Sequence, residues 1–377
     1  MKKRRRRHRL KYGLGYTISR ILLLILALLL IVGAVWGIVV LVKNSLASGG
    51  DYSRLPFEAD DSFTFTKNSF LYYKNGILYY DDFSNNSKDA SYRVNTSEFS
   101  LESSEAISVL YNTTAVQIVG TEQTIEGFGT IEKVKCGLDY IAVLFKDESG
   151  IPFLKIFDKS AAEVDEIRPE SKNSFIMDFG FTDIESNTLW TLLADTSAEI
   201  SVSTITTYDF SKKSTTGVMT VQHQLVESLI FTSNSIFAIG TNDLMRYNNG
   251  NLIYRLPVYG YELVDYSLSS GKCSFLFKSR TEGTAFKTFK LYTVAEKDSP
   301  SDSIVTLHLP GNTLSAALVN EKVVSCTPNK IYTHSYAGEL LKESSLDFTL
   351  TESGVKRIND REVILFSSPS LYKYKVK

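Results

Sequence analysis

The sequence has few of the residues that crosslink small proteins or bind metals. Its 377 residues include three cysteines, four histidines and two tryptophans. The cysteines, Cys136, Cys273 and Cys326, are far apart in the chain, so they indicate neither a disulfide framework nor a CxxC metal or redox site. A chain of this length can bury a full hydrophobic core without such crosslinks.

Motifs that carry catalysis are also missing. There is no HxH or HExxH spacing, no GxSxG nucleophile turn, no DxD pair and no Gly-rich phosphate loop. The chain contains a repeated strand pattern, described below, in which His334 takes a position that is Tyr or Phe in most of the other copies. We therefore predict that His334 is a packed strand residue rather than a ligand. The sequence therefore gives no candidate for a catalytic, cofactor-binding or metal-binding residue, and we expect no cofactor.

Acidic residues are absent from the first fifty positions, which hold ten Lys or Arg. The remainder holds 31 Lys and Arg against 42 Asp and Glu, a net of −11. The two parts are therefore expected to face different surroundings. The basic cluster Arg4, Arg5, Arg6, Arg7 and Arg9 is interpreted as a topology signal that contacts anionic lipid, and not as a nucleic-acid site.

A long apolar run follows the basic segment. Ile21 to Val42 carry no charge, and 22 helical residues rise about 33 Å, enough to cross a hydrocarbon layer of roughly 30 Å. Nine basic residues precede the run, which predicts a cytoplasmic N-terminus, an extracytoplasmic C-terminal part and a single-pass location in the plasma membrane. Gly33 and Gly37 have the GxxxG spacing of helix pairs, so a homodimer through this helix is one hypothesis.

The predicted domain organisation has four parts. Residues 1–20 form a basic cytoplasmic segment, 21–42 a transmembrane helix, 43–52 a linker and 53–377 an extracytoplasmic domain. The alternative is a cleaved signal peptide, since small residues surround a cleavage point after Ala47.

The extracytoplasmic part is made of short apolar and aromatic runs separated by Asn, Gly, Asp or Ser, which is typical of strands and tight turns. The stretch "NSFLYYKNGILYYDD" is one hairpin, in which Asn75 and Gly76 favour a type I′ turn. It belongs to a repeat, because Asp61 to Asp82 aligns with Glu227 to Asn249. The alignment places Ser62, Phe65, Thr66, Asn68 and Ser69 on Ser228, Phe231, Thr232, Asn234 and Ser235.

A second pattern fixes the repeat length. A branched or aromatic residue, followed three positions later by Tyr, Phe or His, marks the third strand of each unit. The pairs are Ile77/Tyr80, Leu154/Phe157, Ile205/Tyr208, Leu244/Tyr247, Phe289/Tyr292, Ile331/His334 and Leu371/Tyr374, with a degenerate copy at Val116/Val119. A period near 40 residues with four short strands is typical of a β-propeller blade. We predict an all-β, eight-bladed propeller; seven blades is the alternative, because the second unit matches worst.

The two ends of the propeller sequence complement each other. The last unit ends after its third strand, and "SRLPF" before the first unit matches the outer strand "YRLPV" of the fifth. We predict that Arg54, Leu55 and Phe57 lie on a strand that pairs with the strand of Leu371 and Tyr374. This pairing would close the ring and remove an exposed sheet edge.

The hairpins "LMRYNNGNLIYRLPV" and "KIYTHSYAGELLKESSL" resemble the blade hairpins of quinoprotein-like propellers. The repeated Trp residues of the enzyme branch are absent, which argues against a quinone cofactor. As a whole, with "LWTLLADTSAEISVSTITTYDFSKKSTTG" in mid-chain, the chain is similar to an uncharacterised family of envelope proteins from Gram-positive, clostridial-type bacteria. The resemblance implies a fold and a location, and no site residues.

The favoured interpretation is a non-catalytic, membrane-tethered binding or scaffold protein of the cell envelope. Its expected partners are membrane lipid around the helix and an envelope protein, peptide or wall glycan, with no nucleic acid. The alternative is an extracytoplasmic enzyme that acts on a carbohydrate or small metabolite, with acidic side chains converging in the propeller channel.

Overall fold

The computed structural model describes residues 52–83, 86–94, 98–169, 173–183, 186–196, 200–269, 271–281, 286–295 and 304–377. The predicted basic segment, transmembrane helix and Gly33/Gly37 contact, and the Ala47 cleavage point, lie outside these residues. Within the described ranges no helix has the length and apolar character needed to span a bilayer. Residues from Ser53 to Lys377 form one compact unit.

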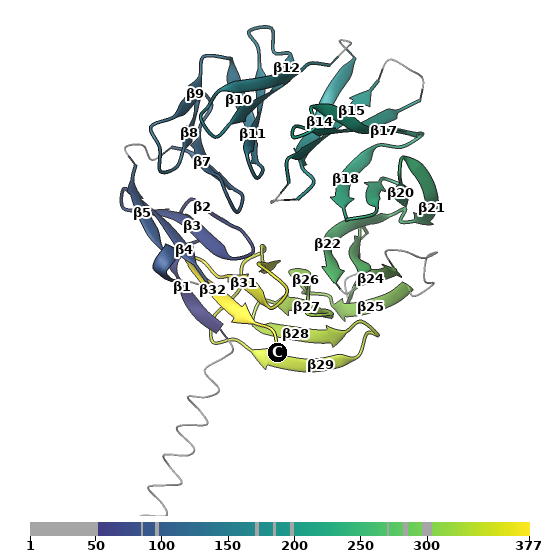
Figure 1. The fold of residues 1–377 in the computed structure, drawn as a ribbon. Coiled ribbons are helices and arrows are strands. Elements are labelled where there is room, and N and C mark those ends of the chain that lie inside the picture. The colour runs from purple at the N-terminus through teal and green to yellow at the C-terminus, as the bar shows by residue number, and fades with distance from the viewer. Residues whose placement is uncertain are drawn as a thin grey trace, which may run out of the picture. The chain divides into compact units, whose positions relative to one another are not determined.

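The described strands form eight antiparallel sheets of four strands each, arranged as a ring (Figure 1). We number these sheets as blades 1 to 8 in chain order.

The first four blades occupy the first half of the ring. Blade 1 is β2 (Phe63–Phe65), β3 (Ser69–Lys74), β4 (Ile77–Asp82) and β5 (Ala90–Arg93), with the 3₁₀ turn η1 (Asn86–Lys88) before β5; blade 2 is β6 (Ser100–Ser103), β7 (Ser108–Tyr111), β8 (Ala115–Ile118) and β9 (Thr124–Glu126); blade 3 is β10 (Thr130–Cys136), β11 (Tyr140–Lys146), β12 (Pro152–Asp158) and β13 (Glu163–Ile167); blade 4 is β14 (Ser174–Phe181), β15 (Thr188–Asp195), β16 (Val202–Asp209) and β17 (Ser214–Gln222).

The remaining four blades complete the ring. Blade 5 is β18 (Val226–Phe231), β19 (Ile236–Gly240), β20 (Asp243–Asn248) and β21 (Asn251–Pro257); blade 6 is β22 (Tyr261–Ser269), β23 (Lys272–Ser279), β24 (Phe286–Ala295) and β25 (Ile304–Pro310); blade 7 is β26 (Ser315–Val319), β27 (Lys322–Thr327), β28 (Lys330–Ser335) and β29 (Leu340–Ser345); blade 8 is β30 (Val355–Arg357), β31 (Glu362–Phe366), β32 (Ser370–Lys375) and β1 (Tyr52–Glu58).

The prediction of an all-β, eight-bladed propeller is therefore confirmed, and the seven-bladed alternative is wrong. The second unit is a complete blade whose third strand, β8, has only four residues. Val116 of β8 is buried, and Val119, which stands at the aromatic position of the other units, is partly buried against a cluster that includes Leu78 and Leu110.

The ring closes as predicted, because β1 is the fourth strand of blade 8 and lies beside β32. The amide of Ala59, directly after β1, donates to the carbonyl of Pro369, directly before β32, at 2.8 Å. The two strands are thus antiparallel. Leu55 and Phe57 are buried in one cluster with Leu371, and Tyr374 is also buried. Arg54 is exposed and pairs with Glu58 at 3.3 Å.

The turns between strands have the backbone conformations that the sequence predicts. Asn75 and Gly76 both have positive φ, at 52° and 82°, as a type I′ turn requires. In the aligned repeats, the amides of Thr66 and Thr232 occupy equivalent positions and donate to the carbonyls of Ser69 and Ser235, at 3.0 and 2.9 Å.

The hydrophobic core is divided among the spaces between neighbouring blades. One cluster joins blades 2 and 3 through residues such as Val109 and Phe145, and another joins blades 3 and 4 through Leu154 and Phe179. Each blade is therefore stabilised mainly by its neighbours, which is the reason why a ring needs closure. The three cysteines are buried, and they form no disulfide with one another.

The ring has two faces that the chain direction defines. We call the side where the inner strand of each blade begins the start face, and the side where it ends the end face. The start face carries the second turn of each blade and the connections between blades, and the end face carries the first and third turns. Since β1 is an outer strand, Tyr52 and Lys377 both lie toward the end face.

Candidate functional site

The inner strands surround a central channel, and their carboxylates are engaged in ion pairs. The pairs that link different blades are Glu102–Lys135 (2.9 Å), Asp178–Lys133 (2.5 Å), Glu227–Arg280 (2.9 Å) and Asp265–Arg357 (3.1 Å). Glu132 and Glu262 pair within their own blades with Lys146 and Lys278. In the described inner strands, every carboxylate thus has a cation within ion-pair distance.

A repeated β-bulge places several of these groups. The register of the inner strand shifts at Ile131/Lys133 in β10, at Ile176/Asp178 in β14, at Val226/Ser228 in β18 and at Leu263/Asp265 in β22. Asp178 and Asp265 each accept a hydrogen bond at 2.8 Å from the amide of the next residue. A bulge redirects a side chain, and here it presents a charged group to the neighbouring blade.

Asp265 connects three blades. Its Oδ1 pairs with Arg357 of blade 8, and its Oδ2 accepts a hydrogen bond at 2.8 Å from the amide of Leu318 in blade 7. Burial raises the pKa of the Asp265 carboxyl, although the positive charge of Arg357 acts in the opposite direction. This arrangement holds blades together and leaves no unengaged carboxylate on the described inner strands to act as a general acid or base.

Two hollows on the end face form one continuous groove, which we call the end-face groove. The larger hollow has a volume of about 1140 Å³ and lies over blades 4, 5 and 6. The smaller has a volume of about 760 Å³ and lies at the mouth of the channel. They share Thr182, Asp183, Phe231 and Leu268.

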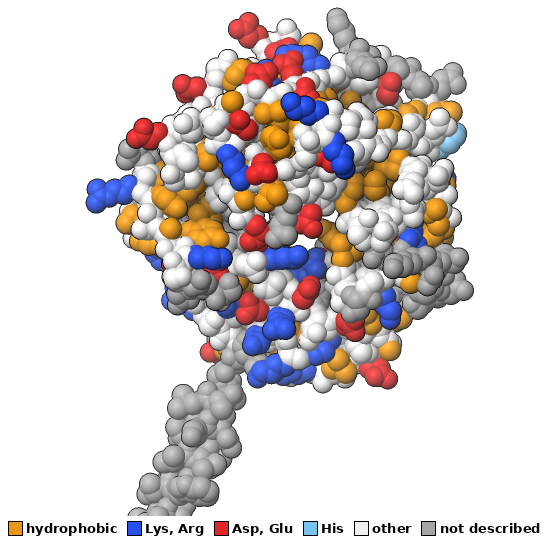
Figure 2. Space-filling view, viewed as in Figure 1, with side chains coloured by type: hydrophobic (Ala, Val, Ile, Leu, Met, Phe, Trp, Pro, Cys, Tyr) orange, Lys and Arg blue, Asp and Glu red, His pale blue; other side chains and the backbone are white. Residues whose placement is uncertain are grey.

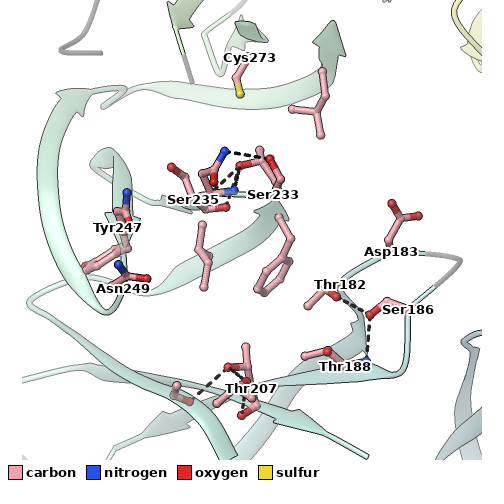
Figure 3. A pocket seen from close by; sticks show the side chains of 18 of the residues that line it. Thr182, Asp183, Ser186, Thr188, Thr207, Ser233, Ser235, Tyr247, Asn249 and Cys273 are labelled. Atoms are coloured by element: carbon pink, nitrogen blue, oxygen red, sulfur yellow. Dashed lines mark hydrogen bonds between the residues drawn. The ribbon is translucent and has the colours of Figure 1, made fainter. Parts of the chain in front are cut away.

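Hydroxyl and amide side chains line most of the larger hollow (Figure 3). Thr182, Ser186 and Thr188 lie on one side, Ser233 and Ser235 come from the turn between β18 and β19, and Thr207 lies along a third wall. Local hydrogen bonds fix several of these groups: Thr182 donates to Ser186 Oγ at 2.9 Å, and Thr216 donates to Thr207 Oγ1 at 2.9 Å.

The same hollow also has apolar positions. Val218 is 60% exposed and Leu268 is 40% exposed, although both are large hydrophobic residues. Phe231 stacks on Trp190 with ring centroids 5.9 Å apart. Strands and turns thus present both polar and apolar groups to the groove, a combination that is usual in ligand sites.

His334 is confirmed as a packed strand residue. It lies in β28, it is half-buried, and its Nδ1 has no hydrogen-bond partner in the described residues. Among those residues, no three His, Cys, Asp or Glu side chains come close enough to hold a metal ion. Burial lowers the pKa of His334 below its usual value of 6.5.

Replacing His334 with Phe, the residue type of equivalent strands, is expected to reduce acid sensitivity. A folded-state pKa below 6.5 means that the unfolded chain binds the proton more tightly, so stability is lost as the pH falls below about 6.5. The loss is at most about 1.4 kcal/mol per pH unit. Thermal unfolding of both proteins at pH 5 and pH 8 measures this: the variant should gain relative stability only at pH 5. An equal difference at both pH values would contradict the assignment.

The groove was not predicted from the sequence. Its residues come from blades 1, 4, 5, 6 and 8, and no motif joins them. One signal does point to it: the repeated Thr-x-Asn-Ser turn places Lys67 at the channel mouth and Ser233 in the larger hollow.

Comparisons with known proteins give structural likeness only. No family model and no curated protein matches the sequence. Among solved structures, Hsv2 of Kluyveromyces marxianus is 10% identical, with a TM-score of 0.46, over 76% of this chain and 98% of that chain. The Pan2 WD40 domain of Neurospora crassa is 9% identical, with a TM-score of 0.42, over 85% and 90%. A chain of the mitotic checkpoint complex is 10% identical, with a TM-score of 0.44, over 86% and 90%.

Proposed function

We propose that this protein is a non-catalytic binding module of the cell envelope, which holds an extended polypeptide segment of a partner protein in the end-face groove. The observation that carries the proposal is the groove itself: a continuous surface of fixed polar groups and exposed apolar side chains across several blades. The ion pairs of the inner-strand carboxylates favour binding over the enzymatic alternative, because these groups are used to join blades.

A polypeptide fits the chemistry of the groove. An extended backbone offers one donor and one acceptor for each residue, and Ser, Thr and Asn side chains can satisfy both. Val218 and Leu268 supply apolar contacts for alternate side chains. A wall glycan fits less well, since sugars stack on exposed aromatic faces and Phe231 already stacks on Trp190.

The proposed location is extracytoplasmic, with a single membrane anchor at residues 21–42. The basic segment, the apolar run and the net charge of −11 beyond residue 50 support it, as does the resemblance to clostridial-type envelope proteins.

Capture of partners by the full-length protein tests the function. Val218→Arg and Leu268→Arg place charges in the groove, and Tyr259→Arg is the matched control on the start face, where this side chain is 81% exposed. We expect a stoichiometric partner from detergent-solubilised envelopes, retained by the control at physiological salt and reduced at least tenfold by each groove variant, as for central interface contacts worth about 1.4 kcal/mol or more.

Two outcomes would contradict the proposal. Equal capture by the groove variants and the parent protein would place the binding surface elsewhere. Loss of capture only with Tyr259→Arg would move it to the start face.

A further inference from the structure

The smaller hollow of the groove has an uneven charge distribution. Five basic residues and three acidic residues line it: Lys67, Arg357, Arg361, Lys373 and Lys375, with Asp183, Asp360 and Glu362. The basic residues all come from blades 8 and 1, where they outnumber the two acidic residues of that side, Asp360 and Glu362. Figure 2 shows Lys and Arg side chains at and below the central opening of the face drawn, with Asp and Glu side chains beside them. We call this side of the hollow the basic wall.

Ion pairs occupy only part of the basic wall. Arg357 pairs with Asp265 at 3.1 Å and with Asp360 at 4.0 Å, and Lys373 pairs with Glu362 at 3.6 Å. Lys67, Arg361 and Lys375 are exposed, and none of them forms an ion pair with the described residues. Three positive charges therefore remain available to a ligand.

The opposite wall is mainly apolar. Phe181 and Phe231 are partly buried, and Leu268 is 40% exposed. Asp183 is the acidic residue that both hollows share, and it lies at the junction between them. Low-dielectric walls concentrate the field of nearby charges, so an anion at the basic wall is held more strongly than on an open surface.

We infer that the basic wall binds carboxylate side chains of the polypeptide that occupies the groove, so that the protein selects acidic segments. This inference rests on the proposed function and adds which polypeptide segments the groove prefers. Arg361 can hold a carboxylate with two parallel hydrogen bonds, and Lys67 and Lys375 act as point charges beside it.

The continuity of the groove favours a peptide carboxylate as the source of the anion. The two hollows share four lining residues, so a chain that lies in the hydroxyl-lined part extends directly to the basic wall. A free phosphate would use only the smaller hollow.

Selection from a randomised twelve-residue peptide library tests the inference and does not require the partner to be identified. The full-length protein is compared with a triple variant, Lys67→Gln, Arg361→Gln and Lys375→Gln. We expect Asp and Glu to be enriched in peptides selected by the parent protein and not in those selected by the variant. A second triple variant, with Gln at Arg93, Lys213 and Lys342, makes the same change in net charge away from the channel mouth and should select as the parent does.

The peptide that binds most tightly is then used to measure how much each basic residue contributes to the affinity. By fluorescence anisotropy, each Lys or Arg change is expected to weaken binding about threefold, and the triple variant roughly thirtyfold. Replacing the Asp and Glu of the peptide by Asn and Gln should give a similar loss. The difference should shrink as salt is raised, since these cations are exposed.

The outcomes separate the inference from the function on which it rests. Groove-dependent selection of peptides without an acidic excess would overturn the inference and leave the proposed function in place. No selected peptide at all would overturn both. Displacement of the peptide by millimolar inorganic phosphate, or stronger binding to phosphatidylglycerol vesicles that depends on the three cations, would also overturn it and identify a free or lipid phosphate as the ligand.

Discussion

Replacing Phe57 with alanine is expected to lower the free energy of unfolding by about 3 to 5 kcal/mol, the usual cost of removing a fully buried Phe side chain. Phe57 is 0% exposed. Its ring lies 5.0 Å from that of Phe63, 5.2 Å from that of Phe70 and 4.7 Å from that of Tyr72, measured between centroids. Since Phe57 belongs to blade 8 and its partners to blade 1, the cavity would weaken the joint that closes the ring.

Chemical denaturation of the full-length protein, followed by circular dichroism, measures this effect. Arg54→Ala is the matched control in the same strand, because Arg54 is exposed and its pair with Glu58 lies on the surface. We expect this control to change stability by less than about 0.5 kcal/mol. If both variants unfold at the denaturant concentration of the parent protein, the closing strand does not stabilise the ring.

Replacing Arg357 with leucine is expected to cost roughly 3 kcal/mol, the lower end of the range for a buried ion pair that loses one partner. The lower end applies because the side chains of Arg357 and Asp265 are 21% and 15% exposed. Without Arg357, the Asp265 carboxylate stays in the channel wall with no cation, and the link between blades 6 and 8 is lost.

Urea unfolding at pH 7 tests this prediction, with Lys330→Leu as the control. Lys330 pairs with Glu343 at 2.6 Å, but both side chains are more than 40% exposed. Its loss should leave the unfolding midpoint unchanged. Equal effects of the two substitutions would mean that the channel pair acts as an ordinary surface pair.

The propeller could be predicted from the sequence because equivalent strands of every blade are buried in similar surroundings. The third strand of each blade packs between its neighbours, so a branched residue at positions such as Ile205 and Leu244 recurs, and both are fully buried. The aromatic position also coincides with an irregularity in strand pairing. The register between the third and fourth strands of the blade shifts at Phe157, Tyr208, Tyr247 and His334. Because the third strand has similar surroundings in each blade, the same residue pattern recurs in the sequence, and the number of its copies predicted eight blades.

The groove could not be predicted in the same way. Thr182, Ser233 and Lys67 lie in turns of different blades, and turns face solvent, where no shared packing constrains the residue type. They meet only because the ring brings blades 1, 4 and 5 around one opening. The inner-strand bulges were likewise not predicted, because the displaced residues, such as Glu132 and Glu227, look like ordinary strand positions in the sequence.

The closing strand also sets an order of events in time. During synthesis β1 emerges before the other described strands, whereas its partner β32 emerges after them. Contacts between distant parts of a chain form slowly, and partly folded chains expose unpaired strand edges. Until β32 emerges, the growing ring therefore stays open, with β1 unpaired at one end and a changing blade edge at the other. The emergence of β32 is the step that closes the ring, so a nascent chain that stalls just before this strand would hold seven finished blades and an unsealed gap.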